Sequence, residues 1–248
     1  MSFWDHLDVL RGTLFRSIGA IVLVSIVFLA IPERLFKAVL WPTTSDFILY
    51  KWLGLDVSMT LINIEVYAQF FVHLKISILM AAIVAFPYVI YEIWRFVAPA
   101  LYDHEKKAVR KAFGMSSFLF YLGVAVGYFI VLPVCLMFFM NYTVSDTVEN
   151  TISLSSYLSL FTSMVFLIGL LFEFPTIVMV LSHLGLLTRK QLRGFRKSAF
   201  VVILVLAAFI TPSDPFSMFV LSIPLYALYE FSILVCKPDT PSVDDLAE

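Results

Sequence analysis

Charged residues and cysteines are both scarce in this chain of 248 residues. Only 14% of its residues are Asp, Glu, Lys or Arg, against about 25% in ordinary soluble proteins. Its two cysteines, Cys135 and Cys236, lie in or beside apolar runs without metal-site spacing, so we expect both to be packing residues. The net charge of −1 offers no basic excess for a nucleic-acid partner. Motifs of the HExxH and GxSxG kinds are absent, so we expect no enzyme activity, no bound metal and no cofactor.

Long apolar runs make up most of what is present. Hydrophobic residues account for 61% of the chain, and the runs are long enough to cross a bilayer as helices. The last run is too long for one helix, and prolines and an acid divide it within 211–215. We therefore predict an all-α integral membrane protein with six transmembrane helices in one domain, residues 1–236, and an acidic, disordered tail, residues 237–248. The spans are expected within Ser17–Pro32, Val66–Tyr91, Ala112–Asn141, Leu154–Leu187 and the two halves of Ser198–Cys236.

Spans five and six are both expected to be short. The fifth covers about 14 residues, from Ser198 to Thr211, which is about 21 Å of helix against an apolar membrane core of about 30 Å. Such a span thins the bilayer or leans on neighbouring helices, and a re-entrant segment is the alternative.

Lysine and arginine are distributed unevenly between the two sets of termini and loops. One set carries thirteen of them and the opposite set carries three. The richer set is cytoplasmic by the positive-inside rule, so we predict that both termini are cytoplasmic, in agreement with an even number of spans. After the first span, apolar residues such as Leu35 and Val39 share one helical face, which predicts a short helix over 32–41 at the outer interface.

The most informative segment runs from Phe86 to Lys107. It begins as the end of an apolar helix and continues with aromatic residues of the kind found at membrane–water interfaces. These are Tyr88, Tyr91, Trp94 and Phe96. After Pro99 it becomes charged, and Glu105 stands there as an acid among cations. By itself Glu105 is better explained as a surface acid paired with a nearby cation. A carboxylate beside an apolar helix exit also suits a ligand that is basic at one end and apolar beyond it, which describes a signal peptide.

Several segments together resemble the TatC family, the multi-span subunit of the twin-arginine protein translocase. The central signature comprises Pro87, Trp94, Phe96, Pro99–Tyr102 and His104–Lys106. The other matching segments, in chain order, are His6-Leu7, Leu10-Arg11, Phe172-Glu173 with Pro175, Thr211-Pro212 with Asp214 and Ser217, and Pro224 with Leu228–Glu230. They extend over nearly the whole chain in the order expected for the family.

The resemblance implies a receptor for twin-arginine signal peptides and the core subunit of a translocase. Such a subunit works in a multi-copy complex with single-span TatB-type and TatA-type subunits, in contact with membrane lipid. It exports folded proteins across the cytoplasmic (inner) membrane of a bacterium, and the proton motive force drives the export.

The resemblance also implies which residues bind the signal peptide. Glu105 matches the family's loop acid in register, whereas the acid expected directly before Leu10-Arg11 is replaced by Val9, with Asp8 one position earlier. A shift of one residue rotates a side chain by about 100° around a helix, so it stays open whether Asp8 replaces the missing acid. The predicted signal-peptide site comprises Glu105, Asp8, Arg11, Trp94 and Phe96.

Two further acids, Glu173 and Asp214, are predicted to be intramembrane polar or partner-binding residues. An acid within a span is functional by default, and Glu173 has three candidate roles: an anchor for a single-span partner's helix, a proton-sensitive group, or an internal structural bond. Lys75 in the second span is one candidate for that bond, and snorkelling of Lys75 to the outer surface is the alternative. Asp214 suits a turn by itself, and the resemblance adds a contact with a partner. Gly123 and Gly127 predict close helix packing in the third span.

Two other classes of function fit the composition. An ion-coupled small-solute transporter would also carry an acid at membrane depth and proline-broken helices, but the six predicted spans contain no inverted repeat. An intramembrane enzyme would need a catalytic motif, and none is found. Reconstitution separates a transporter from a translocase subunit. A transporter works as a lone chain, whereas a translocase subunit needs partners and a cargo with a signal peptide.

Overall fold

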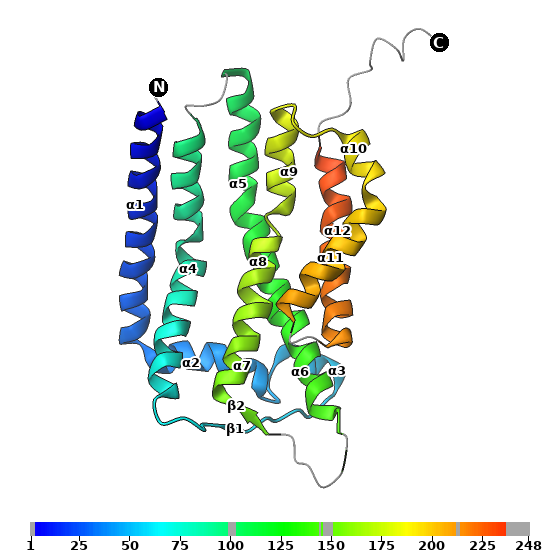
Figure 1. The fold of residues 1–248 in the computed structure, drawn as a ribbon. Coiled ribbons are helices and arrows are strands. Elements are labelled where there is room, and N and C mark those ends of the chain that lie inside the picture. Colours follow the sequence, from blue (N-terminus) through cyan, green and yellow to red (C-terminus); the bar gives the residue numbers. More distant parts are fainter. Residues whose placement is uncertain (1–2, 99–102, 144, 146–150, 212–213, 237–248) are drawn as a thin grey trace.

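The chain is almost entirely helical wherever its structure is described, and its long helices stand side by side as a bundle (Figure 1). The computed structural model describes residues 3–98, 103–143, 145, 151–211 and 214–236, and for 3–6 and 103–109 it gives the backbone alone. The all-α prediction is confirmed. The tail predicted over 237–248 lies outside the described residues.

Within the described part, five helical stretches are long and apolar enough to cross a membrane. They are α1 (Phe3–Ala30); α4 (Ala68–Val97); the run of α5 (Asp103–Val126), η3 (Gly127–Val131) and α6 (Leu132–Asn141); the run of α7 (Leu154–Phe161), η4 (Thr162–Leu167), α8 (Ile168–Leu171) and α9 (Phe174–His183); and α12 (Pro215–Val235).

One more apolar helix, α11 (Arg196–Ile210), follows the short helix α10 (Arg189–Gly194) and precedes α12. Its 15 residues give about 22 Å of helix, so the predicted short helix is confirmed. The expectation of a short sixth span is wrong. α12 begins directly at Pro215 and has 21 residues, which is about the length needed to cross the apolar core.

Two of the long stretches depart from a regular α-helix at the level where they cross. η3 and η4 are π-helical segments, and they pack against each other. Gly127 makes this approach close, because a Cβ there would collide with the carbonyl oxygen of Met164. At Gly123 a Cβ would lie 2.6 Å from the ring of Phe172. The predicted close packing at both glycines is therefore confirmed.

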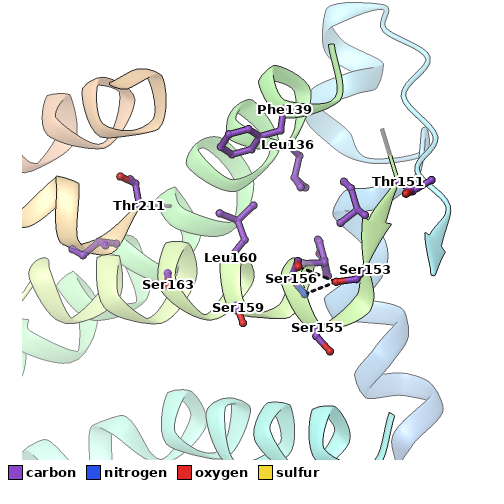
Figure 2. A pocket seen from close by; sticks show the side chains of 13 residues that line it. Leu136, Phe139, Thr151, Ser153, Ser155, Ser156, Ser159, Leu160, Ser163 and Thr211 are labelled. Atoms are coloured by element: carbon purple, nitrogen blue, oxygen red, sulfur yellow. Dashed lines mark hydrogen bonds between the residues drawn. The ribbon is translucent and has the colours of Figure 1, made fainter. Parts of the chain in front are cut away.

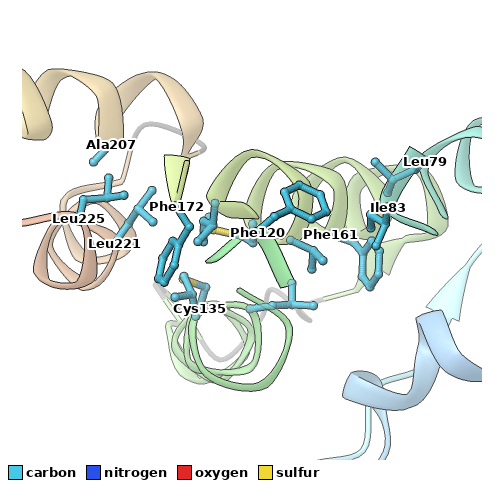
Figure 3. Packing of buried hydrophobic residues seen from close by; sticks show 14 of the residues in the cluster. Leu79, Ile83, Phe120, Cys135, Phe161, Phe172, Ala207, Leu221 and Leu225 are labelled. Atoms are coloured by element: carbon cyan, nitrogen blue, oxygen red, sulfur yellow. The ribbon is translucent and has the colours of Figure 1, made fainter. Parts of the chain in front are cut away.

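The buried core connects α4 to α12 across the middle of the bundle. Phe86 of α4 stacks on Phe120 of α5, with ring centroids 3.6 Å apart, and Phe120 is fully buried. Figure 3 shows how side chains from α4, the α5–α6 run, the α7–α9 run and the last two helices meet in one cluster. Cys135 belongs to this cluster and Cys236 is also buried, both as free thiols. Their predicted role in packing is confirmed.

One end of the bundle is closed by short elements, and we call it the cap end. It carries α2 (Pro32–Leu40), the 3₁₀ turn η1 (Trp41–Thr43), α3 (Ile48–Leu53), and two strands, β1 (Leu61–Ile62) and β2 (Ile152–Ser153), which pair in parallel (Figure 1). Leu35 and Val39 of α2 are buried, so the predicted amphipathic helix is confirmed.

Tyrosine hydroxyls hold the cap end together by donating to backbone carbonyls. Tyr157 donates to Val39 at 2.5 Å, Tyr128 to Ala38 at 2.6 Å, and Tyr50 to Pro42 at 3.0 Å. Burial raises the pKa of Tyr50 well above its ordinary value, so its hydroxyl stays protonated and keeps donating. The bonds from Tyr157 and Tyr50 are buried and satisfy carbonyl oxygens that water does not reach, whereas the bond from Tyr128 is exposed.

The opposite end, which we call the basic end, is built from helix termini. The start of α1, the end of α4, the start of α5, α10 and the end of α12 all lie there (Figure 1). The cations at this end include Arg11, Arg95, Arg110, Arg189 and Arg193. Among the candidate spans α1 is the least buried, and nearly all of its contacts are with α4. The basic end therefore carries charged groups both on the well-packed helices and on α1, which packs mainly against α4.

Candidate functional site

The predicted signal-peptide residues come from three helices that reach the basic end. Asp8 and Arg11 lie on α1 and are exposed, and the guanidinium of Arg11 stands 5.6 Å from the ring centroid of Phe15. Glu105 lies in the first turn of α5, and its side chain is outside the described residues. The fold thus places the start of α1, the end of α4 and the start of α5 at the same end of the bundle.

The two aromatic residues of the predicted site lie near the end of α4. Trp94 is half-buried, and its ring packs against Phe113 of α5 with centroids 5.3 Å apart. Phe96 is also half-buried. Trp94 therefore links α4 to α5, and it offers an apolar surface near the start of α5, where Glu105 lies.

A buried acid, Glu92, is the main feature that the sequence did not reveal. Its side chain is only 2% exposed, and Oε2 accepts a hydrogen bond from Arg16 Nε on α1 at 2.8 Å. Oε1 accepts from the hydroxyl of Tyr88 at 3.2 Å and lies 4.0 Å from Nη1 of Arg95. The available signal was an acid four residues after a tyrosine on an apolar helix, but only the neighbouring helix identifies its partner.

Glu173 sits where the fourth long stretch breaks between α8 and α9. It is 9% exposed, and Ser116 Oγ of α5 donates to its Oε2 at 2.5 Å. Thr176 lies beside the same carboxylate, one turn further along. Glu173 stands about 15 Å from the end of α9, so it is deep within the bundle and bound to a hydroxyl. The internal bond that we listed as one candidate role is therefore present, with Ser116 as the donor.

Lys75 does not pair with Glu173, contrary to one of the candidate pairings. Lys75 is exposed on α4, eleven residues before Phe86, which stacks on Phe120 of α5. That places Lys75 about 16 Å further toward the cap end than Phe86, whereas Ser116 lies one turn from Phe120 toward the basic end. The two charges are therefore at different depths.

Asp214 caps the start of α12. Its Oδ2 accepts the backbone N–H of Ser217 at 2.6 Å, and Pro215 occupies the first turn. This is the arrangement that Asp adopts at a helix N-terminus. The structural role expected of a turn-forming Asp is therefore confirmed, while its contact with a partner stays a prediction.

A cavity of about 730 Å³ opens beside this turn and is lined mainly by hydroxyls and apolar side chains. Figure 2 shows Ser155, Ser156, Ser159 and Ser163 on successive turns of the α7–η4 stretch, together with Thr211 from the end of α11. Thr211 is 5% exposed, and its hydroxyl has no hydrogen-bond partner among the described residues. The cavity can therefore receive a polar group. No cluster of His, Cys, Asp and Glu suitable for a metal occurs in the described part of the chain.

These features define an integral membrane protein with apolar helical spans, a charged end, and acids held inside the bundle. Comparison with known proteins identifies its family. A family model described as "Sec-independent protein translocase protein (TatC)" matches residues 5–224. The chain belongs to the TatC family of protein translocases.

Individual relatives agree with this assignment over nearly their full length. A TatC of Blattabacterium is 34% identical over 251 residues, covering 95% of this chain and 94% of the relative. The TatC of Escherichia coli K12 is 31% identical, covering 94% of this chain and 86% of the relative. A crystal structure described as the twin-arginine translocase receptor TatC, in DDM, superposes with a TM-score of 0.78 at 34% identity, covering 94% of this chain and 99% of the other.

Proposed function

We propose that this protein is the receptor and core subunit of a twin-arginine translocase. It binds twin-arginine signal peptides at the cytoplasmic face of a bacterial inner membrane. With TatB-type and TatA-type single-span subunits, in a multi-copy complex, it exports folded proteins at the expense of the proton motive force. The observation that carries this proposal is the convergence at the basic end of α1, α4 and α5, which bear two acids and an aromatic surface in a TatC-family chain.

The proposed topology has six spans with both termini in the cytoplasm. Two features support it: the start of α1 and the end of α12 lie at the same end of the bundle (Figure 1), and that end carries the excess of Lys and Arg. In this topology α11 is the fifth span although it is short, and α12 returns to the basic end as the sixth.

Recognition of the arginine pair follows from the chemistry of carboxylates. A guanidinium forms charge-assisted, often bidentate hydrogen bonds with a carboxylate, whereas a lysine ammonium offers a point charge without the planar fork. Glu105 is the primary acceptor in this proposal, with Asp8 and Arg11 on α1 beside it. Trp94 and Phe96 provide the surface for the apolar segment that follows the arginines.

Contacts with the single-span subunits are proposed at the two intramembrane acids. Oδ1 of Asp214 is buried without a hydrogen-bond partner among the described residues, and Thr211, three residues earlier in the chain, lines the hydroxyl-rich cavity. A polar side chain on a partner's helix would satisfy these groups. Glu173, bound to Ser116 by only one of its oxygens, offers a second polar anchor.

The test is crosslinking to a signal peptide from photoreactive residues at positions 8, 9 and 105, with Glu105→Gln as the central variant in an unlabelled background. We expect an Arg-Arg peptide to crosslink and a Lys-Lys peptide to crosslink much less. Glu105→Gln should weaken binding of the Arg-Arg peptide by about tenfold or more, since a charge-assisted hydrogen bond is lost.

Glu33→Gln is the matched control, because Glu33 is an exposed acid on α2 at the cap end. Binding that is equally strong for both peptides would contradict the receptor function. Binding that survives Glu105→Gln but still prefers Arg-Arg would remove only Glu105 from the site. Solute uptake by the lone reconstituted chain would instead favour a transporter.

A further inference from the structure

The pair formed by Arg16 and Glu92 joins the two helices that lead into the proposed site. Their burial is very unequal: the Glu92 side chain is 2% exposed and the Arg16 side chain is 42% exposed. Arg16 thus covers the carboxylate, and part of its own side chain stays exposed on the outside of the bundle. The pair is the only one in the described part of the chain that couples an acid on α4 with a cation on α1.

Arg16 binds the carboxylate with part of its donor set. Nε donates to Glu92, while Nη2 turns to the hydroxyl of Thr13 at 3.4 Å, one turn closer to the start of α1. The guanidinium therefore points toward the basic end, as side chains on a helix generally do. Oε1 of Glu92 is held by Tyr88 and only distantly by Arg95, so the carboxylate keeps capacity for a further donor.

The position of the pair relates it to the family's missing acid. Val9 replaces that acid, and it lies four residues before Thr13 on the same face of α1. Thr13 is buried, and Val9, which is 37% exposed, lies one turn nearer the basic end. Glu92 supplies a carboxylate from the neighbouring helix, about one turn deeper than Val9.

An arginine of a ligand can replace Arg16 at the Glu92 carboxylate without leaving that buried charge unpaired. Removing the partner of a buried carboxylate is strongly unfavourable, but replacing Arg16 by an arginine of the ligand preserves both the charge balance and the hydrogen bonds. Arg16 is partly exposed and has a long, flexible stem that already points toward the start of α1, so it can move aside toward the basic end. A lysine ligand would match the vacated place less well, since it lacks the planar fork.

We infer that Glu92 is a specificity-determining carboxylate for an arginine of the signal peptide, and that Arg16 occupies it as an internal substitute until the ligand arrives. This inference rests on the proposed function, because it adds a second acceptor to the same site. It also explains how a chain with Val9 in place of the family's acid provides two carboxylates for two arginines.

The experiment compares Glu92→Gln, Arg16→Gln and the double variant in the full-length protein. Affinity is measured for a synthetic Arg-Arg peptide with an apolar segment and for its Lys-Lys counterpart, and the melting temperature is recorded with and without peptide. Glu92→Gln should weaken Arg-Arg binding about tenfold and reduce discrimination against Lys-Lys. Arg16→Gln, which removes the internal competitor, should bind the Arg-Arg peptide more tightly than the wild type does.

Stability gives a second readout that a purely structural pair would not produce. Arg16→Gln should melt at a lower temperature without peptide, and the Arg-Arg peptide should raise its melting temperature more than it raises that of the wild type. The double variant should behave like Glu92→Gln. Arg16→Lys keeps a cation in place and tests the same idea if Arg16→Gln does not fold, because a lysine competes less well and should again permit tighter Arg-Arg binding.

The control is Glu230→Gln, which breaks another interhelical pair of the same length, Arg196 to Glu230 at 2.8 Å, between α11 and α12. Its peptide affinity should equal that of the wild type. The inference is overturned if the Arg16 variants bind no more tightly than the wild type, or if Glu92→Gln binds normally. If the wild type itself does not prefer Arg-Arg over Lys-Lys, the proposed function fails as well, and the two failures are thereby distinguished.

Discussion

The two ends of the molecule are stabilised in different ways. At the cap end, tyrosine hydroxyls bond to backbone carbonyls around the fully buried ring of Phe47. Where α1 meets α4 near the basic end, the strongest polar contact is the ion pair of Arg16 and Glu92. A ligand cannot take the place of a neutral hydrogen bond between a tyrosine and the backbone, whereas a cationic ligand can replace the cation of an ion pair. The comparison suggests that the cap end is a scaffold and that the α1–α4 part of the basic end is the adaptable region.

The largest effect is expected from disrupting the close helix crossing at Gly127, next to Tyr128, which bonds to the cap end. Gly127→Ala would place a Cβ in collision with the backbone of Met164, and backbone cannot move aside as a flexible side chain can. We expect a loss of about 3 kcal/mol of stability, measured by thermal melting in detergent. The matched control is Gly114→Ala in α5, earlier in the same helical run. An added Cβ at Gly114 would meet no neighbouring heavy atom within 4 Å. Equal melting temperatures for the two variants would contradict the close crossing.

A smaller effect should follow from removing one cap-end hydroxyl. Tyr157→Phe leaves the buried carbonyl of Val39 without its donor, at a cost of about 2 kcal/mol. Tyr128→Phe, whose bond to Ala38 is more exposed, should cost less. Both variants should bind the Arg-Arg peptide with wild-type affinity. A weakened affinity at unchanged melting temperature would show that the two ends are coupled, and the distinction between scaffold and adaptable region would then fail.

The smallest effect is expected at the cap of α12, where structural and partner roles can be separated. Asp214→Ala should lower stability by about 1 kcal/mol, because the N–H of Ser217 loses its acceptor. Asp214→Asn retains an acceptor of similar capping strength and should melt like the wild type. If the carboxylate also contacts a single-span partner, Asp214→Asn should still reduce co-purification of that partner. Normal co-purification with Asp214→Asn would assign Asp214 to capping alone.

The sequence predicts those features that depend on local composition. Hydrophobic runs locate the spans, the pattern around Leu35 and Val39 predicts α2, and the four-residue spacing of Gly123 and Gly127 predicts a close helix crossing. Each of these depends on residues near one another in the chain. The length of α12 was misjudged, because apolar counting alone does not show that the helix begins directly at Pro215.

Features that depend on which helices are neighbours could not be predicted in this way. Glu92 looks like one more residue of an interfacial segment until α1 brings Arg16 beside it. The same limitation made Lys75 a candidate partner for Glu173, whereas the fold supplies Ser116. The π-helical segments and the pairing of β1 with β2 are likewise products of tertiary packing.

The short pairing of β1 with β2 has a consequence for the order in which the chain assembles. Leu61 and Ile62 meet Ile152 and Ser153, so the two strands close a ring of about 90 residues that contains two of the long membrane helices. Closing a flexible ring of that size costs about 4 kcal/mol in chain entropy, more than two residue pairs can supply. The strands must therefore join after the helices have docked, and intact pairing at residues 61–62 would serve as a late marker of a completed molecule.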